Sequence, residues 1–598
     1  MLFSKLAEYF EKLEQTSSRL TLIDILSDLF SEVEASEIAK VCYLIQGRVA
    51  PFYEALEIGM AEKTVAASIA RAYGVEREEV LKEYGKLGDL GLVAERHSGK
   101  RVKRVDPESD SGVLRQNVGV PRMTVGDVFE QLRKIAQISG EGTVEKKQGL
   151  LVDLLTKMDG VSAKHLVRIP LGASRLGIGD PTILDGFAKA KLGDRKKRVE
   201  LEEAYNKTSD LGLIGEVLWE KGLEGVRKLE VAVGRPIRSQ LTERLPDAKT
   251  ILEKFGGEAH VQYKYDGFRV EIHKNGDSVR LFSRNLEETT PMFPELIEGV
   301  KKQVKAKTAI LDSEALAFNP VSEEFLPFQE TTKRRRKYNI ADMAKTLPLK
   351  AFVFDVMYLD GKSLIDLPLR DRMKKLADVI EGNEVLIPQP GEITDLESRI
   401  NELFGDAITK GLEGLVVKRP DSKYEAGARN FNWVKLKRHS AGELKDTIDC
   451  VILGYIFGRG KRVEFGAGSL LVGVYDESQD EFVTVSKIGT GLTDEEWREI
   501  HKRADKIKVD HKPARVNSIL VPSVWIAPEI VIEVLADEIT KSPVHTAGAS
   551  TSSASGEKQP GLALRFPRLV KFREADKTAE DATTVKELLE MYKQQFKK

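Results

Sequence analysis

The sequence predicts a multidomain protein with an all-α N-terminal domain, an α+β middle domain and an all-β C-terminal domain. The first observation is length, because 598 residues exceed the size at which a single hydrophobic core usually stops growing. The second is a change near Val231, where a helical spacing of apolar residues gives way to alternation. The third is a series of short, glycine-rich strand signals after Arg438. The predicted boundaries are 1–225, 226–438 and 439–598.

Composition limits the classes of protein that fit. The net charge is −1, which favours neither a nucleic acid nor any other charged partner. There is no apolar run of the roughly 18 residues that a membrane helix needs, and the segment MLFSKLAEYFEKLEQ is typical of an amphipathic helix rather than a signal peptide. Two cysteines, Cys42 and Cys450, are too few for a disulfide framework or a four-cysteine zinc site. We expect a cytoplasmic protein.

The first segment, residues 1 to about 220, is predicted to be helical. Apolar residues recur at intervals of three and four, as in Leu20–Leu26, and alternation of β-branched residues is scarce. Breaks at Gly140–Gly142 and Ile169-Pro170 separate the helices.

The middle segment is predicted to mix strands and helices. The stretch His260–Arg284 alternates apolar and polar residues and contains Asn275-Gly276, a strong signal for a two-residue hairpin turn. A helix is predicted at Arg370–Ile380. Further strands are predicted at Ala309–Phe318, Ala351–Leu359, Gly414–Arg419 and Asn432–Lys437.

The last segment is predicted to form a small β-barrel. Its strands are expected at Asp449–Phe457, Gly468–Tyr475 and Phe482–Ile488. The Ser- and Gly-rich tract 547–561 predicts a flexible loop, and a charged helix is expected at the C-terminal end.

One stretch of the middle segment suits covalent chemistry. On a strand, Gln262, Lys264 and Asp266 face one side, while Tyr263 and Tyr265 face the other. A lysine amine is a nucleophile only in its neutral form, and nearby cations favour that form. The letters Lys-Tyr-Asp-Gly alone are also common on surface strands, so a functional interpretation needs further motifs downstream in the chain.

Five such motifs are present, each on or beside a predicted strand. Trp433, Lys435 and Lys437 share one face of the last strand, which would direct them toward a polyphosphate. Glu413 and Lys418 have opposite parity, so we expect Glu413 to precede its strand. The motifs are Ser283–Asn285, Leu311–Glu314, Phe352–Asp355, Glu413–Lys418 and Trp433–Lys437.

The six motifs in this order resemble the covalent nucleotidyltransferases, a superfamily of DNA ligases, RNA ligases and mRNA capping enzymes. The basic stretch Arg565–Lys577 resembles the C-terminal motif of ATP-dependent DNA ligases, and Arg168–Asp180 resembles a signature of the DNA-binding domain in archaeal and eukaryotic replicative ligases. This resemblance implies a helical DNA-binding domain, a nucleotidyltransferase (adenylation) domain and an OB-fold domain that together encircle nicked duplex DNA. Short connections between the motifs favour an archaeal enzyme. We also expect a monomer.

The resemblance also implies a role for each matched residue. Lys264 would be the catalytic nucleophile that takes AMP from ATP, and Glu314 and Glu413 would hold Mg²⁺, with Mn²⁺ as an alternative. ATP and AMP would be bound by Gln262, Arg269, Arg284, Glu314, Phe354, Arg429, Lys435 and Lys437. Pyrophosphate would be oriented by Arg565, Arg568, Arg573 and Lys577, and DNA phosphates would be contacted by Arg168 and Arg175.

The chain departs from the family pattern at two positions. Ser313 stands where the family usually has glycine, which would narrow the space beside Glu314. Gln262 stands where an acidic residue is common, which would alter the contacts around the purine.

Two other functions share part of this evidence. A capping enzyme or RNA ligase has the central motifs but needs no helical segment of this length ahead of its lysine, and a non-catalytic scaffold needs neither the lysine nor its cationic partners. An NAD-dependent ligase would carry a four-cysteine zinc site. The absence of a Walker A sequence removes P-loop chemistry. The sequence shows no convincing motif for binding a sliding clamp, so that partner stays open.

Overall fold

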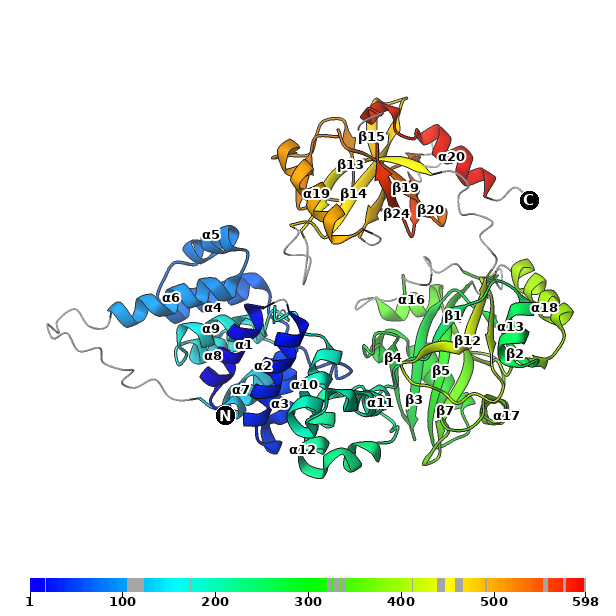
Figure 1. Cartoon of the computed structure of the whole chain (residues 1–598), viewed down its shortest axis with the longest axis horizontal. Coiled ribbons are helices and arrows are strands. Elements are labelled where there is room, and N and C mark those ends of the chain that lie inside the picture. The colour runs from blue at the N-terminus through cyan, green and yellow to red at the C-terminus, as the bar shows by residue number, and fades with distance from the viewer. Residues whose placement is uncertain are drawn as a thin grey trace. The chain divides into compact units, whose positions relative to one another are not determined.

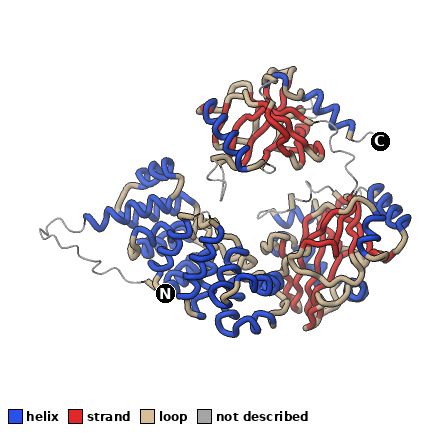
Figure 2. Tube along the Cα trace, in the orientation of Figure 1, coloured by secondary structure: helices blue, strands red, loops and turns tan. Residues whose placement is uncertain are grey.

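The structure is a computed structural model, and the order of helical, mixed and strand-rich regions agrees with the predicted fold class. Figures 1 and 2 show the three regions along the chain. Contacts between residues group the chain into two compact units, Met1–Leu436 and Lys437–Lys598. The described residues are 1–598 except 17, 105–122, 173, 320–323, 327–330, 332, 335–338, 411, 438–446, 458–465, 490–491, 552–557, 574–576 and 596–598.

The N-terminal region is helical, as predicted. Its helices are α1 (Phe3–Glu14), α2 (Arg19–Glu32), α3 (Ala35–Ile45), α4 (Glu62–Tyr73), α5 (Arg77–Leu87), α6 (Leu90–Arg104), α7 (Val125–Gln137), α8 (Thr143–Leu155), α9 (Gly160–Arg168), α10 (Asp180–Leu192), α11 (Arg198–Thr208) and α12 (Leu211–Arg227). The amphipathic N-terminal segment forms α1, whose apolar face is buried. Within the described residues, no helix combines the length and apolar character needed to cross a membrane.

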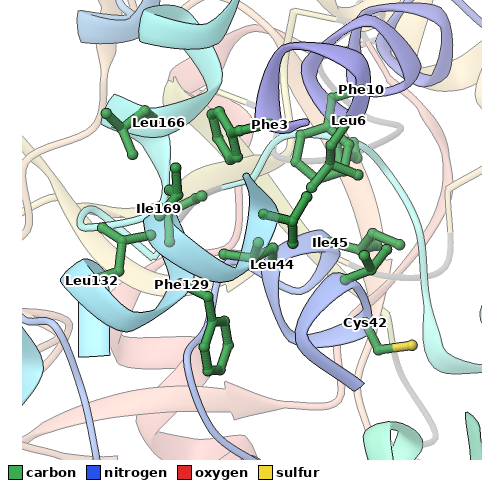
Figure 3. Packing of buried hydrophobic residues seen from close by; sticks show 14 of the residues in the cluster. Phe3, Leu6, Phe10, Cys42, Leu44, Ile45, Phe129, Leu132, Leu166 and Ile169 are labelled. Atoms are coloured by element: carbon green, nitrogen blue, oxygen red, sulfur yellow. The ribbon is translucent and has the colours of Figure 1, made fainter. Parts of the chain in front are cut away.

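One apolar core holds these helices together. Figure 3 shows Phe3 and Phe10 of α1 among side chains from α3, α7 and α9. Phe129 of α7 and Leu166 of α9 belong to the same cluster and are almost fully buried. Burying one such side chain contributes about 1.5–3 kcal/mol, so the helical region is stabilised chiefly by this shared core.

The middle region contains two β-sheets whose outer faces are covered by helices. A five-stranded sheet has the order β1-β12-β11-β2-β10, and α13 and α18 pack on its outer face. A seven-stranded sheet contains β4-β3-β5-β7-β8, with β6 beside β5 and β9 beside β7, and α14 and α17 cover its outer face. Gln262 and Trp433 of the first sheet and Phe354 of the second lie on the faces that the two sheets turn toward each other.

The bounds of these elements match the predicted strands closely. The strands are β1 (Leu241–Arg244), β2 (Ala259–Lys264), β3 (Phe268–Asn275), β4 (Ser278–Ser283), β5 (Thr308–Asn319), β6 (Glu324–Phe325), β7 (Leu349–Leu359), β8 (Lys362–Ser363), β9 (Leu386–Pro388), β10 (Glu392–Thr394), β11 (Gly414–Lys418) and β12 (Arg429–Lys437). The helices are α13 (Ala248–Phe255), α14 (Pro294–Gln303), α16 (Ile340–Thr346), α17 (Leu369–Val379) and α18 (Glu397–Thr409).

The predicted hairpin is present with its turn shifted by one residue. Asn275 pairs with Ser278, so the two loop residues are Gly276 and Asp277 rather than Asn275 and Gly276. Gly276 has a φ of +57°, a conformation that glycine adopts without strain. The glycine therefore occupies the first loop position.

The C-terminal unit is rich in strands. Its main sheet has the order β16-β18-β13-β14-β15-β17, with β19 pairing β13 and β24. The strands are β13 (Ile448–Ile456), β14 (Ser469–Asp476), β15 (Glu481–Ile488), β16 (Lys508–Val509), β17 (Val516–Asn517), β18 (Val524–Ile526), β19 (Val531–Leu535), β20 (Glu538–Ser542), β21 (Ser550–Thr551), β22 (Lys558–Gln559), β23 (Gly561–Arg565) and β24 (Arg568–Phe572). The helices are α19 (Asp494–Ala504) and α20 (Val585–Gln594).

The Ser- and Gly-rich tract differs from its prediction where it is described. Ser550 and Thr551 form β21, which pairs with β22 at Lys558 and Gln559. Residues 552–557 lie outside the described part of the chain. The ends of the tract are therefore a short strand pair, not a loop throughout.

Candidate active site

Lys264 is the last residue of β2 and lies beside the carboxylate of Glu413. Its Nζ is 2.6 Å from Oε2 of Glu413, and its side chain is about a quarter exposed. The backbone N–H of Glu413 donates to the carbonyl of Lys264 (3.1 Å), which holds the two residues side by side. Because β11 begins at Gly414, Glu413 precedes the strand, and the expected resolution of the parity conflict is confirmed. A lysine amine and a carboxylate thus meet where β2 ends and β11 begins.

The glycine of the Lys-Tyr-Asp-Gly motif is required by a close approach between two strands. A Cβ atom on Gly267 would lie 2.3 Å from the carbonyl oxygen of Ala315, well inside contact distance. The backbone of Gly267 also hydrogen-bonds the Glu314 carboxylate. The turn after Lys264 therefore brings β3 against β5 and sets Glu314 near the lysine.

Arg269 and Asp312 form an ion pair on the opposing sheet. Nε of Arg269 donates to Oδ1 of Asp312 (2.8 Å), Nη2 binds Oδ2, and Nη1 donates to the carbonyl of Gln240 (2.9 Å). The hydroxyl of Tyr424 donates to Asp312 at 2.9 Å and accepts from Arg269 at 3.2 Å. Burial alone would lower the pKa of Arg269, but the charge of Asp312 outweighs it and raises that pKa. Arg269 is therefore a fixed cation.

Burial strongly alters the acidity of the Glu314 carboxyl. Burial raises the pKa of its carboxyl to about 7, against the opposing effect of the cations Lys264 and Arg269. Its charge therefore changes near neutral pH, and a bound cation would favour the ionised form.

Gln262 and Lys418 both donate to the backbone carbonyl of Phe354. Nε2 of Gln262 donates to the carbonyls of Phe354 (3.1 Å) and Gln389 (2.5 Å), and Nζ of Lys418 donates to the same Phe354 carbonyl (3.2 Å). The side-chain oxygen of Gln262 is buried and has no hydrogen-bond partner among the described residues. Gln262 thus presents an acceptor, fixed in orientation by its two donated bonds.

Aromatic rings lie beside Lys418. Its Nζ is 3.8 Å from the centroid of the Trp433 ring and 4.9 Å from that of Phe354, and the two rings meet edge to face at 6.2 Å. Burial lowers the pKa of Lys418 to about 7. Phe354 is only partly buried, so one of its faces could stack on a flat base.

Strand β12 shows the predicted alternation. Val434 and Leu436 are buried in the core beneath α13 and α18, whereas Trp433 packs on the other face beside Tyr424. Lys435 is partly exposed on the Trp433 side, and the side chain of Lys437 lies outside the described part of the structure. Two other predicted nucleotide-binding residues are exposed at strand ends: Arg284 follows β4 and Arg429 begins β12.

The four predicted pyrophosphate-orienting residues belong to the C-terminal unit, and each pairs with a carboxylate there. The pairs are Arg565 with Glu538 (2.9 Å), Arg568 with Asp537 (2.8 Å), Arg573 with Glu533 (2.9 Å) and Lys577 with Asp449 (2.5 Å). The pairs of Arg565 and Arg568 are a third to a half exposed and contribute only about 0–1 kcal/mol, so a polyphosphate could compete for these two cations. The pairs of Arg573 and Lys577 are less exposed.

Two of the sequence-based roles need correction. Arg168 is 2 % exposed, and its guanidinium binds Asp89 and Glu14 inside the helical region, so a DNA phosphate cannot reach it without breaking those pairs. Ser313 is fully buried on the other face of β5, where its hydroxyl donates to the carbonyl of Val270 (2.7 Å), so it does not narrow the space beside Glu314. Arg175 is about half exposed and donates to the carbonyl of Gly88, which leaves it accessible to a phosphate.

Sequence reasoning gave no role to four residues that shape the site. Asp312 and Lys418 lie within matched motifs, and strand parity could have placed Asp312 on the face of Glu314. Tyr424 and Gln240 carried no local signal, because their contacts with Arg269 join segments far apart in sequence.

Comparison with known proteins identifies the family. Residues 239–437 match the model of the ATP dependent DNA ligase domain, residues 2–188 match the DNA ligase N terminus, and residues 464–577 match the ATP dependent DNA ligase C terminal region. A probable DNA ligase of Dictyoglomus turgidum is 46% identical over 597 residues, which span 100% of this chain and 98% of that protein. The chain belongs to the ATP-dependent DNA ligase family.

Other members of this ligase family agree. A DNA ligase of Sulfolobus acidocaldarius is 40% identical over 601 residues, with 100% of this chain and 99% of that protein covered, and the predicted archaeal affinity fits this relative. Among solved structures, one titled Pmar-Lig_PreS3 has 16% identity and a TM-score of 0.50 over 95% of this chain and 99% of its own, a likeness in fold alone.

Proposed function

We propose that the protein seals nicks in duplex DNA with ATP, through a lysyl-AMP intermediate on Lys264. The observation that carries the proposal is the position of Lys264 at the end of β2, beside Glu413 and opposite Glu314 and Arg269, in a chain of this ligase family. The family also disfavours the capping, RNA-ligase and scaffold alternatives.

The reaction would begin with attack of Lys264 on ATP. Its Nζ forms a bond to the α-phosphorus, the bond from that phosphorus to the bridging oxygen breaks, and pyrophosphate leaves. The AMP then moves to the 5′-phosphate of a nick, and the 3′-hydroxyl displaces it to form the phosphodiester bond. Because negative charge spreads over phosphoryl oxygens in each step, fixed cations around the phosphates supply much of the catalysis.

The surrounding residues would divide the binding of the nucleotide. Phe354 would stack on the adenine, and the fixed side-chain oxygen of Gln262 would accept from a donor on the base. Arg269 and Arg284 would hold the ribose, Arg429 would contact the nucleotide, and Lys435 and Lys437 would hold phosphates. In the C-terminal unit, Arg565, Arg568, Arg573 and Lys577 would orient the pyrophosphate.

The carboxylates fit a magnesium ion. Mg²⁺ prefers oxygen ligands, and Glu314 and Glu413 both interact with the same lysine, Lys264. Mg²⁺, or Mn²⁺ in its place, would neutralise phosphate charge when bound. Glu314 holds such an ion only when ionised, which its pKa of about 7 makes sensitive to pH.

The architecture of the family suggests the remaining assignments. We propose that the strand-rich unit is an OB-fold domain, because β13, β14 and β15 form an antiparallel meander that β18 and β19 extend. The helical region would bind duplex DNA through Arg175. The domain boundaries 1–225, 226–438 and 439–598 and the monomeric state stay predictions.

One experiment tests the proposal. The protein is incubated with Mg²⁺ and ATP labelled on the α-phosphate, and then with nicked duplex DNA. We expect a covalent label on the protein that survives alkali but is lost in acid, as a phosphoramidate is, and that moves to the DNA 5′-phosphate and then leaves as AMP. Lys264→Ala should remain unlabelled, and label on that variant would refute the assignment of the nucleophile. Label that moves to nicked RNA but never to DNA would favour the RNA-ligase alternative.

A further inference from the structure

A short segment joins the helical region to the nucleotide site within the first compact unit. Arg238, Ser239 and Gln240, here called the linker strap, follow the last helix of the N-terminal region and precede β1. At one end Arg238 contacts α10 and α11, and at the other Gln240 contacts Arg269.

Hydrogen bonds from the side chain and from the backbone of Arg238 hold this end of the linker strap against the helical region. Nη2 of Arg238 donates to Oδ2 of Asp180 (2.6 Å) and to the hydroxyl of Tyr205 (2.5 Å), and its guanidinium lies 4.5 Å from the centroid of the Tyr205 ring. The backbone N–H of Arg238 donates to the carbonyl of Asn206 (2.8 Å). Tyr205 also donates to Asp180 (2.6 Å), so the three side chains form a closed triangle of hydrogen bonds.

The nucleotide end of the strap is held as firmly. The carbonyl of Gln240 accepts from Nη1 of Arg269, its side-chain oxygen accepts from the backbone N–H of Glu425 (2.9 Å), and its backbone N–H donates to the hydroxyl of Tyr424 (3.3 Å). Gln240 is fully buried. Tyr424 and Arg269 both bind Asp312, so the linker strap supports the Arg269–Asp312 ion pair that lines the site.

A second backbone contact holds the linker strap against the loop that leads to Arg429. The backbone N–H of Gly427 donates to the carbonyl of Arg238 (2.9 Å), in the loop that leads to Arg429. A Cβ atom on Gly427 would lie 2.7 Å from the side chain of Asn206 in α11. The loop and the helix are therefore packed against each other with no space for a larger residue.

Asp180 connects the linker strap to the predicted DNA-binding segment. It is the first residue of α10 and the last residue of the Arg168–Asp180 segment, in which Arg175 is exposed. We propose that Arg238 is a positioning residue for the nucleotide site, and that the linker strap couples the Arg168–Asp180 segment to Arg269. A duplex bound at that segment would then change the affinity for ATP, and ATP would change the affinity for DNA by the same factor. The DNA part of this inference rests on the proposed function.

The first test measures a change at Asp180 by its effect on ATP. The rate of lysyl-AMP formation is recorded against ATP concentration, without DNA, for wild type, Asp180→Asn, Arg238→Met and the double variant. We expect each single variant to raise the ATP concentration for half-maximal rate by about fivefold, at the lower end of couplings between sites. The double variant should raise this ATP concentration no further than either single variant does, because both residues act through one path.

Asp24→Asn is the matched control. Asp24 pairs with Lys189 (2.7 Å) of the same helix α10, but both partners lie in the helical region. This variant should match wild type. If Asp180→Asn also matches wild type, or if the effects of Asp180→Asn and Arg238→Met add, the inference is wrong. Should Arg238→Met fail to fold, Asp180→Asn still decides, because it exchanges a single atom on a partly exposed side chain.

The second test measures the coupling directly. The affinity for a non-hydrolysable ATP analogue is determined with and without nicked duplex. In wild type and in Asp24→Asn, the duplex should change the affinity for the analogue, and in Asp180→Asn it should not. If the duplex changes the affinity of Asp180→Asn as much as that of wild type, the inference is wrong. Failure of the proposed function would look different, since wild type would then form no lysyl-AMP, or would form it without passing AMP to nicked DNA.

Discussion

Replacing Arg372 should loosen the strand that carries Phe354. Arg372 and Asp355 form a fully buried ion pair, with Nε to Oδ1 at 2.8 Å and Nη2 to Oδ2 at 3.0 Å. Nη1 also donates to the carbonyls of Leu367 (2.7 Å) and Ser422 (3.1 Å). Burial alone would raise the pKa of Asp355, but Arg372 and Lys418 keep it below its usual value.

The magnitude follows from leaving a buried charge without its partner. Arg372→Met removes two charge-assisted bonds and two bonds to carbonyls, and breaking a buried pair in this way costs about 3–5 kcal/mol. Lys418, whose Nζ is 3.9 Å from Asp355, remains as a partial partner, so we expect the lower end, about 3 kcal/mol. Asp355→Asn combined with Arg372→Met should cost less than Arg372→Met alone, because no unpaired carboxylate remains.

Hydrogen exchange measures the loss of stability at individual amides. A local measurement is needed because a chain with several domains need not unfold in a single step. Amides of β7 and α17 should exchange about 100-fold faster in Arg372→Met than in wild type, since each 1.4 kcal/mol is a factor of ten. Lys374→Met on the same helix is the control, because Lys374 is 76% exposed and pairs only with Asp371 within the described chain. Unchanged exchange in Arg372→Met, or a double variant that exchanges faster still, would refute the reasoning.

Three further outcomes are expected. Lys264→Arg should form no covalent AMP while its melting temperature stays within a few degrees, because a guanidinium keeps its proton; labelled protein would contradict this. Arg168→Ala should destabilise the helical region by about 3–5 kcal/mol in denaturant unfolding, because Asp89 stays buried, whereas Arg175→Ala should keep its stability and lower the salt dependence of duplex binding by about one unit of slope. In the folded state the pKa of Glu314 is raised to about 7 from 4.5. Between these two pH values the folded state binds more protons than the unfolded state, so the free energy of unfolding falls as pH rises from 4.5 to about 7. Glu314→Gln should flatten this fall by at most about 3 kcal/mol, and an identical pH profile in the variant would count against the burial of that charge.

The fold was largely predictable because its elements have strong local patterns. The strands β5, β7, β11 and β12 lie where alternation placed them, and helix α17 lies one residue from its predicted bounds. The shifted hairpin turn at Gly276 shows the limit of such signals, because Asn-Gly identifies the turn but register with Ser278 decides which residues form it. Local pattern therefore fixes the element and tertiary pairing fixes its last residue.

The site was predictable only where a motif and a strand coincide. The parity of Glu413 indicated that it lies outside β11, and the structure confirms this. Arg168 was misassigned because a basic residue in a glycine-rich signature suggests a phosphate contact, while its buried acidic partners, Asp89 and Glu14, lie far away in the sequence. Ser313 was misassigned because its effect was argued from its neighbour Glu314 and not from the face it occupies.

The contacts of Arg269 reconcile a buried ion pair with a role in binding. A guanidinium has five N–H groups, and the hydrogen bonds to Asp312, Gln240 and Tyr424 account for four of them. Among the described residues no hydrogen bond takes up the second N–H of Nη1, which under the proposed function would donate to a ribose hydroxyl. Because the other four bonds fix the plane of the guanidinium, that donor would already be oriented when ATP arrives, and little side-chain entropy would be lost on binding. Lysine at this position would keep the charge but could not bind Asp312 through two parallel bonds while also reaching Gln240, so Arg269→Lys should weaken ATP binding despite its unchanged charge.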